Sequence, residues 1–147
     1  MWENACGEGH LSDRLKELGY EVATSDIIDR NGCVDQIIDF LSFNGNWHGD
    51  ILTNPPYKYA QGWVEKSMKV LRKNSKLYLF LKLTFLEGQK RRKMFEKYPP
   101  KYVYVFSKRI QVAINGDPEM FKKSSAAAYA WFVWQKGFNG NPIIKWI

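Results

Sequence analysis

A short corner, Asn54-Pro55-Pro56-Tyr57, follows the strand-like apolar run 50–53 and groups an amide, a carbonyl and an aromatic ring. The amide oxygen of Asn54 and the carbonyl of Pro55 can accept both hydrogens of an exocyclic amino group, and Tyr57 offers a ring for stacking. Proline fixes φ and lacks an N–H, so the paired prolines stiffen the loop and leave it offering acceptors. This grouping indicates a site that holds a planar amine for chemistry at its nitrogen.

A second candidate element lies at the start of the chain, where a short segment runs into Cys6-Gly7-Glu8-Gly9 and then into a helical pattern. Glycine lets the backbone approach a ligand closely, and free N–H groups at a helix N-terminus favour a carboxylate. The loop lacks the GxGxxG spacing and has no P-loop lysine, which argues against a dinucleotide or a triphosphate. The next apolar run ends in Asp26, an acid placed to accept hydrogen bonds from ribose hydroxyls. These features predict a site for a nucleotide-like cofactor.

Short apolar runs alternate with helical patterns, which predicts an α/β fold with a mostly parallel sheet and helices on both faces. We predict seven strands and three helices, the strands over 2–5, 21–25, 34–38, 50–53, 76–83, 102–106 and 127–134 and the helices over 11–18, 59–72 and 89–98. No helical pattern separates the last two strands, so we expect them to pair antiparallel. Ligands of such sheets bind beyond the carboxyl ends of the strands, where Gly7, Gly9, Asp26, Asp39 and Asn54 would converge.

These motifs and their order resemble those of the S-adenosylmethionine-dependent amino-group methyltransferases, most closely the bacterial and phage DNA adenine-N6 methyltransferases. The resemblance spans nearly the whole chain and implies a Rossmann-like class I methyltransferase fold, S-adenosylmethionine as cofactor, and Asn54, Pro55, Pro56 and Tyr57 as the catalytic motif. The cofactor-binding residues that it implies are Glu3, Ala5, Cys6, Gly7, Glu8, Gly9, Asp26, Ile27, Asp39 and Phe40. Two departures are that Asn4 stands where the family usually has proline and that the helix usual before the first strand is missing.

Some of these residues have an alternative interpretation. Asp35 is a rival of Asp39, either acid could cap a turn, and Phe40 could belong to the core. Cys6 is better explained as a small packing residue than as a nucleophile, because methyl transfer to nitrogen needs no covalent intermediate. The resemblance implies direct methyl transfer to an amino nitrogen of a base that has left the duplex stack, with Tyr57 as its stacking platform.

Composition and charge limit the number of domains and the class of partner. The chain has 147 residues, 45% of them hydrophobic, which is enough for one core, so we expect a single domain over 1–147 without a target-recognition domain. A formal net charge of +7 favours a polyanionic partner, and the resemblance makes DNA the expected nucleic acid. Candidate phosphate contacts are Lys90, Arg91, Arg92 and Lys93 in the third helix and Lys122 and Lys123 between the last two strands.

The two cysteines, Cys6 and Cys33, form neither a C-x-x-C pair nor a Cys/His cluster, which argues against a metal site and against a disulfide framework. The chain carries no signal-peptide pattern and no apolar stretch of membrane length, so we predict a cytoplasmic protein without a membrane partner. Three functions stay open: an adenine-N6 methyltransferase acting on DNA, the same chemistry on an RNA base or a protein glutamine amide, and a truncated, non-catalytic nucleic-acid-binding remnant.

Overall fold

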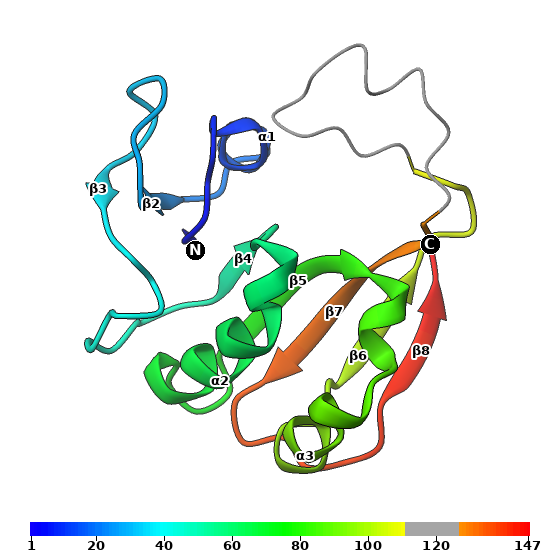
Figure 1. The fold of residues 1–147 in the computed structure, drawn as a ribbon. Helices are drawn as coiled ribbons and strands as arrows, with labels where there is room; N and C mark the ends of the chain where they lie inside the picture. Colours follow the sequence, from blue (N-terminus) through cyan, green and yellow to red (C-terminus); the bar gives the residue numbers. More distant parts are fainter. Residues whose placement is uncertain (111–126) are drawn as a thin grey trace.

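The computed structural model describes residues 1–110 and 127–147 of the chain (Figure 1). Its strands are β1 (Trp2–Glu3), β2 (Ala23–Asp26), β3 (Gln36–Ile37), β4 (Ile51–Thr53), β5 (Lys76–Lys82), β6 (Tyr102–Val105), β7 (Tyr129–Gln135) and β8 (Ile143–Trp146). Its helices are α1 (His10–Glu17), α2 (Ala60–Val70) and α3 (Gln89–Lys97), with short 3-10 turns η1 (Tyr57–Tyr59) and η2 (Leu83–Leu86). Each predicted strand and helix therefore has a counterpart, with ends displaced by a few residues.

Within the described residues the strands form one sheet in the order β3-β2-β1-β4-β5-β7-β6-β8. Neighbours from β3 to β5 pair parallel, whereas β7 pairs antiparallel with both β5 and β6. The prediction of a mostly parallel sheet with an antiparallel β7 is confirmed.

The prediction that the sheet has seven strands and ends with the antiparallel one was wrong. A further strand, β8, follows β7 and pairs parallel with β6, with Tyr102 opposite Ile143 and Val105 opposite Trp146. The run 143–147 is too short for its periodicity to indicate a strand. Its hydrogen bonds come from β6, about forty residues earlier in the chain, as in the bond from the Ile143 N–H to the Lys101 carbonyl at 3.1 Å.

Helices lie on both faces of the sheet. The step from β1 to β2 and the step from β4 to β5 run in opposite directions along the sheet, so right-handed crossovers place α1 and α2 on opposite faces. In α2 the spacing of Trp63, Val64, Ser67 and Met68 turns one stripe of the helix towards the sheet, where all four are buried. Together α2 and α3 cover β5, β7 and β6 on the face that holds the main core (Figure 1).

The carboxyl ends of β1, β2 and β4 meet at one edge of the sheet, because the three strands are neighbours and parallel. In register, Trp2 of β1 lies opposite Ala23 of β2 and Ile51 of β4. The loops that follow these strands therefore start side by side. No helix in residues 1–110 and 127–147 has the length and apolar character needed to cross a bilayer.

Candidate active site

The glycine loop after β1 is held against the end of β2. The Cys6 N–H donates to the Ser25 carbonyl at 3.1 Å, and the Gly7 N–H donates to Oδ2 of Asp26 at 2.9 Å. Gly7 and Gly9 have φ values of 59° and 85°, a left-handed conformation that side chains disfavour. A Cβ built on Gly7 would have no atom within 4 Å, so the loop is open on that side.

Asp26 anchors this loop rather than lying free at the end of β2. Its carboxylate is 9% exposed; one oxygen accepts the Gly7 N–H, and the other is 3.4 Å from a guanidinium nitrogen of Arg30. The following residue, Ile27, is 59% exposed. The acid predicted to bind a ribose thus lies directly beside the glycine loop, with a hydrophobic side chain exposed next to it.

Two buried polar side chains lie at the end of β1, just before the loop. In the described part of the chain Oε2 of Glu3 and Nδ2 of Asn4 have no hydrogen-bond partner. Burial raises the pKa of the Glu3 carboxyl to about 7, with smaller contributions from Asp13 and Asp26, while hydrogen bonds from Ser12 oppose the rise. Glu3 is therefore a buried carboxyl close to the point of half-protonation at neutral pH.

Asn4, which stands where the resembling family has proline, ties the glycine loop to α2. Its Oδ1 accepts a hydrogen bond of 2.9 Å from Nε1 of Trp63, and both side chains are buried. No sequence signal connects these two residues, because 59 positions separate them. The substitution that looked like a departure from the motif has a structural role here.

The corner 54–57 follows β4. Asn54 and Pro56 are exposed, Pro55 is buried, and Tyr57 is half-buried at the start of η1. The Tyr57 hydroxyl is buried without a hydrogen bond to another described residue, and burial raises its pKa well above the usual value. The neighbouring Tyr129 adds to the rise and Asn54 opposes it, so the hydroxyl stays protonated across the working range of an enzyme.

The structure brings the glycine loop and the Asn54 corner to the same edge of the sheet. They follow β1 and β4, which are adjacent and parallel, and the bond between Asn4 and Trp63 joins the loop to the helix that follows the corner. Asn54 is exposed at the same edge of the sheet as the glycine loop.

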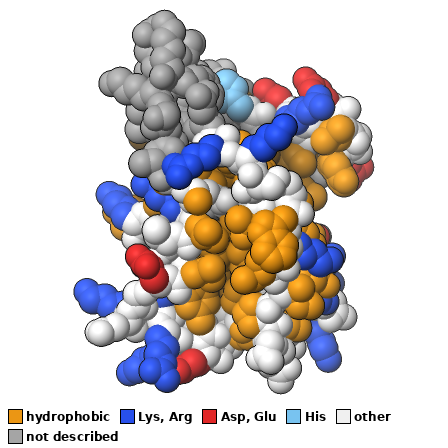
Figure 2. Space-filling view, turned by 90° about the vertical axis from the view of Figure 1, so that its right-hand side faces the viewer, with side chains coloured by type: hydrophobic (Ala, Val, Ile, Leu, Met, Phe, Trp, Pro, Cys, Tyr) orange, Lys and Arg blue, Asp and Glu red, His pale blue; other side chains and the backbone are white. Residues whose placement is uncertain are grey.

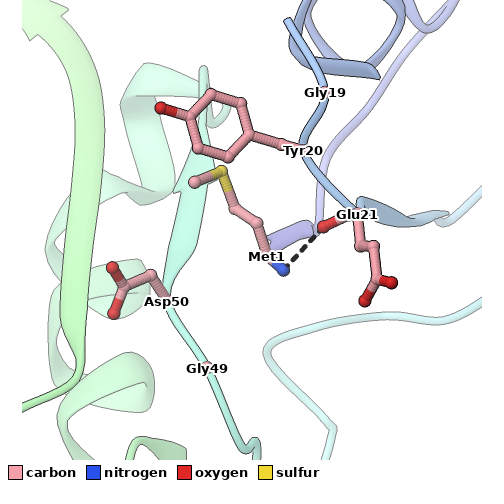
Figure 3. A pocket seen from close by; sticks show the side chains of 6 residues that line it. All are labelled: Met1, Gly19, Tyr20, Glu21, Gly49 and Asp50. Carbon is pink, nitrogen blue, oxygen red and sulfur yellow. Dashed lines mark hydrogen bonds between the residues drawn. The ribbon is translucent and has the colours of Figure 1, made fainter.

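Two hollows among the described residues lie at the other edge, beyond the amino ends of the parallel strands. Figure 3 shows the larger, of about 490 Å³, lined by Met1, Gly19, Tyr20, Glu21, Gly49 and Asp50. In it the Met1 ammonium donates to the Glu21 carbonyl at 2.9 Å. The second is lined mainly by residues 97–99 and 134–139. Neither contains a residue predicted for the site.

The acids after β2 differ in their environment. Asp39 is exposed and caps a turn, accepting Ser42 Oγ at 2.7 Å and the Leu41 N–H at 3.0 Å. Asp35 accepts the Thr24 N–H at 2.7 Å, a bond that lowers the pKa of its carboxyl, so it holds its own loop against β2.

Phe40, predicted to meet the cofactor adenine, belongs to the core. Its side chain is 1% exposed, with ring centroids 5.4 Å from Trp2 and 5.3 Å from Trp63. The residue is therefore closed off from a ligand in this arrangement.

The other predicted cofactor-loop residues line the same turn. Ala5 and Glu8 are half-buried, and Cys6 is 6% exposed. Burial, followed by the neighbouring Cys33 thiol, raises the pKa of Cys6 to about 12, so this thiol is protonated and packs as a small side chain.

The basic stretch on α3 divides into tied and free side chains. The Arg91 guanidinium donates to the Phe85 carbonyl at 2.9 Å and lies 5.0 Å from the Phe85 ring centre, so it holds η2 in place. Arg92 pairs with Glu96 at 2.9 Å, whereas Lys90 and Lys93 are exposed. The predicted contacts Lys122 and Lys123 lie outside the described residues.

No family model matches this chain, and no curated protein is similar to it in sequence. Solved structures do resemble it. A protein from Listeria monocytogenes assigned to the class I S-adenosylmethionine-dependent methyltransferases is similar over 99% of this chain and 56% of its own, with a TM-score of 0.59 and 13% identity. An S-adenosylmethionine-dependent methyltransferase from Methanosarcina mazei is similar over 92% of this chain and 91% of its own, with a TM-score of 0.57 and 12% identity.

The fold is that of the class I S-adenosylmethionine-dependent methyltransferases. A 23S rRNA methyltransferase shares it, with a TM-score of 0.54 and 14% identity over 92% of this chain and 60% of its own. This chain thus spans between half and two thirds of the Listeria and rRNA methyltransferase chains. At these low sequence identities the structural similarity establishes the fold alone. The glycine loop and the Asn54 corner lie at the carboxyl edge of the sheet.

Proposed function

We propose that this chain is an S-adenosylmethionine-dependent methyltransferase that transfers a methyl group to an exocyclic amino group, namely N6 of adenine in DNA. One observation carries the proposal: the glycine loop and the Asn54 corner follow adjacent parallel strands of a class I sheet and are joined through the buried bond between Asn4 and Trp63. Ligands of open α/β sheets bind at this edge. A cofactor and an amine acceptor would meet there.

The residues of the glycine loop suit S-adenosylmethionine. Gly7 has a left-handed φ, and no atom would lie within 4 Å of a Cβ on it, so the backbone is free on the side where a ligand approaches. Asp26, at the end of β2, holds the Gly7 N–H with one oxygen, and its other oxygen, 3.4 Å from the Arg30 guanidinium, would accept a ribose hydroxyl. The orphaned Oε2 of Glu3 adds a buried polar atom behind the loop. When bound, S-adenosylmethionine supplies a methyl group on a positively charged sulfur.

Asn54 and Pro55 act on the acceptor. An adenine amino nitrogen is a poor nucleophile, because its lone pair is delocalised into the ring. Acceptors at the Asn54 amide oxygen and the Pro55 carbonyl would hold its two hydrogens and favour a pyramidal nitrogen with its lone pair available. The nitrogen would take the methyl group as the methyl carbon–sulfur bond of the cofactor breaks, and the electron pair of that bond would stay on sulfur as a neutral thioether. The methylated nitrogen would release one proton to water.

Tyr57 stacks on the acceptor and does not serve as a base. Its ring is half-buried beside the corner, and burial raises the pKa of its hydroxyl, so the hydroxyl carries its proton while the ring packs. A base that leaves its stack gains back part of the lost stacking energy on such a ring.

The test is an incubation of the purified protein with methyl-labelled cofactor and separate pools of DNA, RNA and protein, followed by nucleoside and amino-acid analysis. We expect label in N6-methyladenine from DNA. Asn54→Ala should lower transfer at least about 100-fold while cofactor affinity, measured by calorimetry, changes by less than about threefold. Asn139→Ala is the matched control, because Asn139 is exposed in the loop after β7, at the other edge of the sheet.

The other outcomes identify the alternatives. Label in an RNA nucleoside, towards which the similarity to an rRNA methyltransferase points, or label in glutamine would keep the methyltransferase chemistry and replace the acceptor. An absence of cofactor binding would identify a non-catalytic remnant. Equal loss of binding and transfer in Asn54→Ala would contradict the assignment of this residue to the acceptor.

A further inference from the structure

One face of the strands β5, β7, β6 and β8 is not covered by a helix in the described part of the chain. Register decides which side chains share a face: Leu79 lies opposite Phe132, and Phe132 opposite Val103, and all three belong to the core under α2 and α3. Phe80 lies opposite Trp131 and therefore points to the other face. We call this second face the open face.

Aromatic rings form a continuous track on the open face, and the track starts at the candidate site. The Tyr57 ring is 6.2 Å from that of Tyr129, which stacks on Phe80 with centroids 5.2 Å apart and planes within 3°. Phe80 in turn lies 5.3 Å from Trp131. Tyr129 and Phe80 are only 7% and 9% exposed, so they form the buried start of a track that leads from the Asn54 corner across β7 to the more exposed Trp131.

The track continues over β6, where Tyr104 lies opposite Trp131 and its ring is 5.7 Å from that of Tyr102. Trp131, Tyr102 and Tyr104 are half-buried, and Ile143 on β8 beside them is 49% exposed. Figure 2 shows hydrophobic side chains gathered in a broad patch on the side of the molecule where β8 lies, bordered mainly by lysine and arginine side chains and by a few acidic ones.

The strands that form the open face carry charged side chains of one sign. The strands β5, β6, β7 and β8 contain three lysines and no acidic residue. All three lysines point to the open face by register: Lys76 lies opposite Gln135, Lys82 opposite Tyr129 and Lys145 opposite Tyr104. The Lys145 ammonium is 5.0 Å from the Tyr102 ring centre, and the Lys82 ammonium is 5.7 Å from that of Tyr57. Lysines thus accompany the aromatic track along its length.

We propose that the open face binds single-stranded DNA, namely the strand adjoining the base held at the Asn54 corner. Flat rings that stack on bases, with cations along them that meet phosphates, are the two components of single-strand recognition. The choice of DNA rests on the proposed function. A second copy of the chain fits less well, because two faces with the same lysines would repel each other.

The test measures binding without catalysis. Fluorescein-labelled single-stranded DNA, duplex DNA and single-stranded RNA of the same sequence are titrated with the protein, and anisotropy is followed at two salt concentrations. We expect single-stranded DNA to bind tightest, with an affinity that falls as salt rises. Lys145→Glu should weaken binding about tenfold. Lys69→Glu makes the same charge change at an exposed residue of α2, away from the open face, and should change binding less than about twofold.

Ultraviolet cross-linking uses the unmodified protein, so its result does not depend on whether a variant folds. We expect cross-linked peptides from β6 and β7 to carry the nucleotide at Tyr104 and Trp131. Preference for duplex DNA or RNA, equal weakening by both variants, or cross-links confined to α1 and α3 would overturn the inference, as would light scattering that finds a dimer closed over the open face.

The inference and the proposed function fail separately. A protein that binds single-stranded DNA through the open face but transfers no methyl group would refute the proposed methyltransferase function and support the proposed DNA-binding face. A protein that methylates DNA, and whose Lys145→Glu variant has an unchanged KM for DNA, would refute the proposed DNA-binding face and support the proposed methyltransferase function.

Discussion

The buried carboxyl of Glu3 leads to a quantitative prediction about stability. Glu3 is 2% exposed at the end of β1, and one of its oxygens has no partner among the described residues. Burial is the largest cause of its raised pKa, which is about 7 in place of 4.5. The group is therefore stable in the folded protein as the neutral acid and costs free energy as the carboxylate.

The sign of the effect follows from proton binding. The folded protein binds this proton more tightly than the unfolded chain, so the contribution of Glu3 is complete below pH 4.5 and is lost as pH rises to about 7. At 1.36 kcal/mol for each pKa unit, the rise from 4.5 to about 7 corresponds to about 3 kcal/mol of unfolding free energy.

The assay is urea unfolding between pH 4.5 and 8 for the unmodified protein, Glu3→Gln and Glu21→Gln. Glutamine keeps the shape of Glu3 and cannot ionise. Between pH 4.5 and pH 8 the unfolding free energy of the unmodified protein should therefore fall by up to about 3 kcal/mol more than that of Glu3→Gln. Glu21 is exposed, and its replacement should leave the pH profile parallel to that of the unmodified protein. If the Glu3→Gln profile is also parallel, the carboxyl is hydrated in solution and the reasoning from burial is refuted.

Three further substitutions probe the scaffold of the site, each by thermal and urea unfolding. Gly9→Ala places a side chain at a φ of 85° and should cost about 1–2 kcal/mol, and an unchanged midpoint would mean that the loop relaxes freely. Trp63→Phe removes the bond to Asn4 and leaves a buried amide wholly unpaired, a loss of about 1–3 kcal/mol, which a midpoint shift of less than a degree would contradict. Arg91→Ala removes the hydrogen bond to the Phe85 carbonyl and should lower the unfolding free energy by about 1–2 kcal/mol. Lys90→Ala, at an exposed residue of α3, should change it by no more than about 0.5 kcal/mol. Equal effects would show that Arg91 does not hold η2 in place.

The order of strands and helices could be predicted because it depends on neighbours in the chain. The apolar stripe of α2 and the runs of β4 and β5 repeat over a few residues, and each element lies within a few residues of its predicted range. The antiparallel β7 followed from the lack of a helical pattern before it. Within the described residues, β8 was missed because a four-residue strand owes its existence to β6 and carries too little periodicity of its own.

In the candidate site, too, some features could be predicted from the sequence and others could not. The glycine loop, Asp26 and the Asn54 corner were recognisable from residue types, and their place at one edge follows from the rule that parallel strands share their carboxyl ends. Their roles in binding and transfer stay predictions. The sequence left open whether Phe40 belongs to the core, because its burial depends on Trp2 and Trp63 arriving from other elements. The turn made by Asp39 was likewise one of two open alternatives, and the contact of Arg91 with Phe85 had no signal in the residue types.

Local patterns in the chain were thus sufficient for the fold class, the motifs at the strand ends and the positive charge that favours a nucleic-acid partner. Tertiary structure alone decided that Asn4 meets Trp63, that Glu3 is buried, and that aromatic rings and lysines of β5 to β8 gather on one open face. The physical reason is the range of the interactions. Periodicity and turn preference act between residues a few positions apart, whereas burial, desolvation and shared faces arise between segments that only folding brings together.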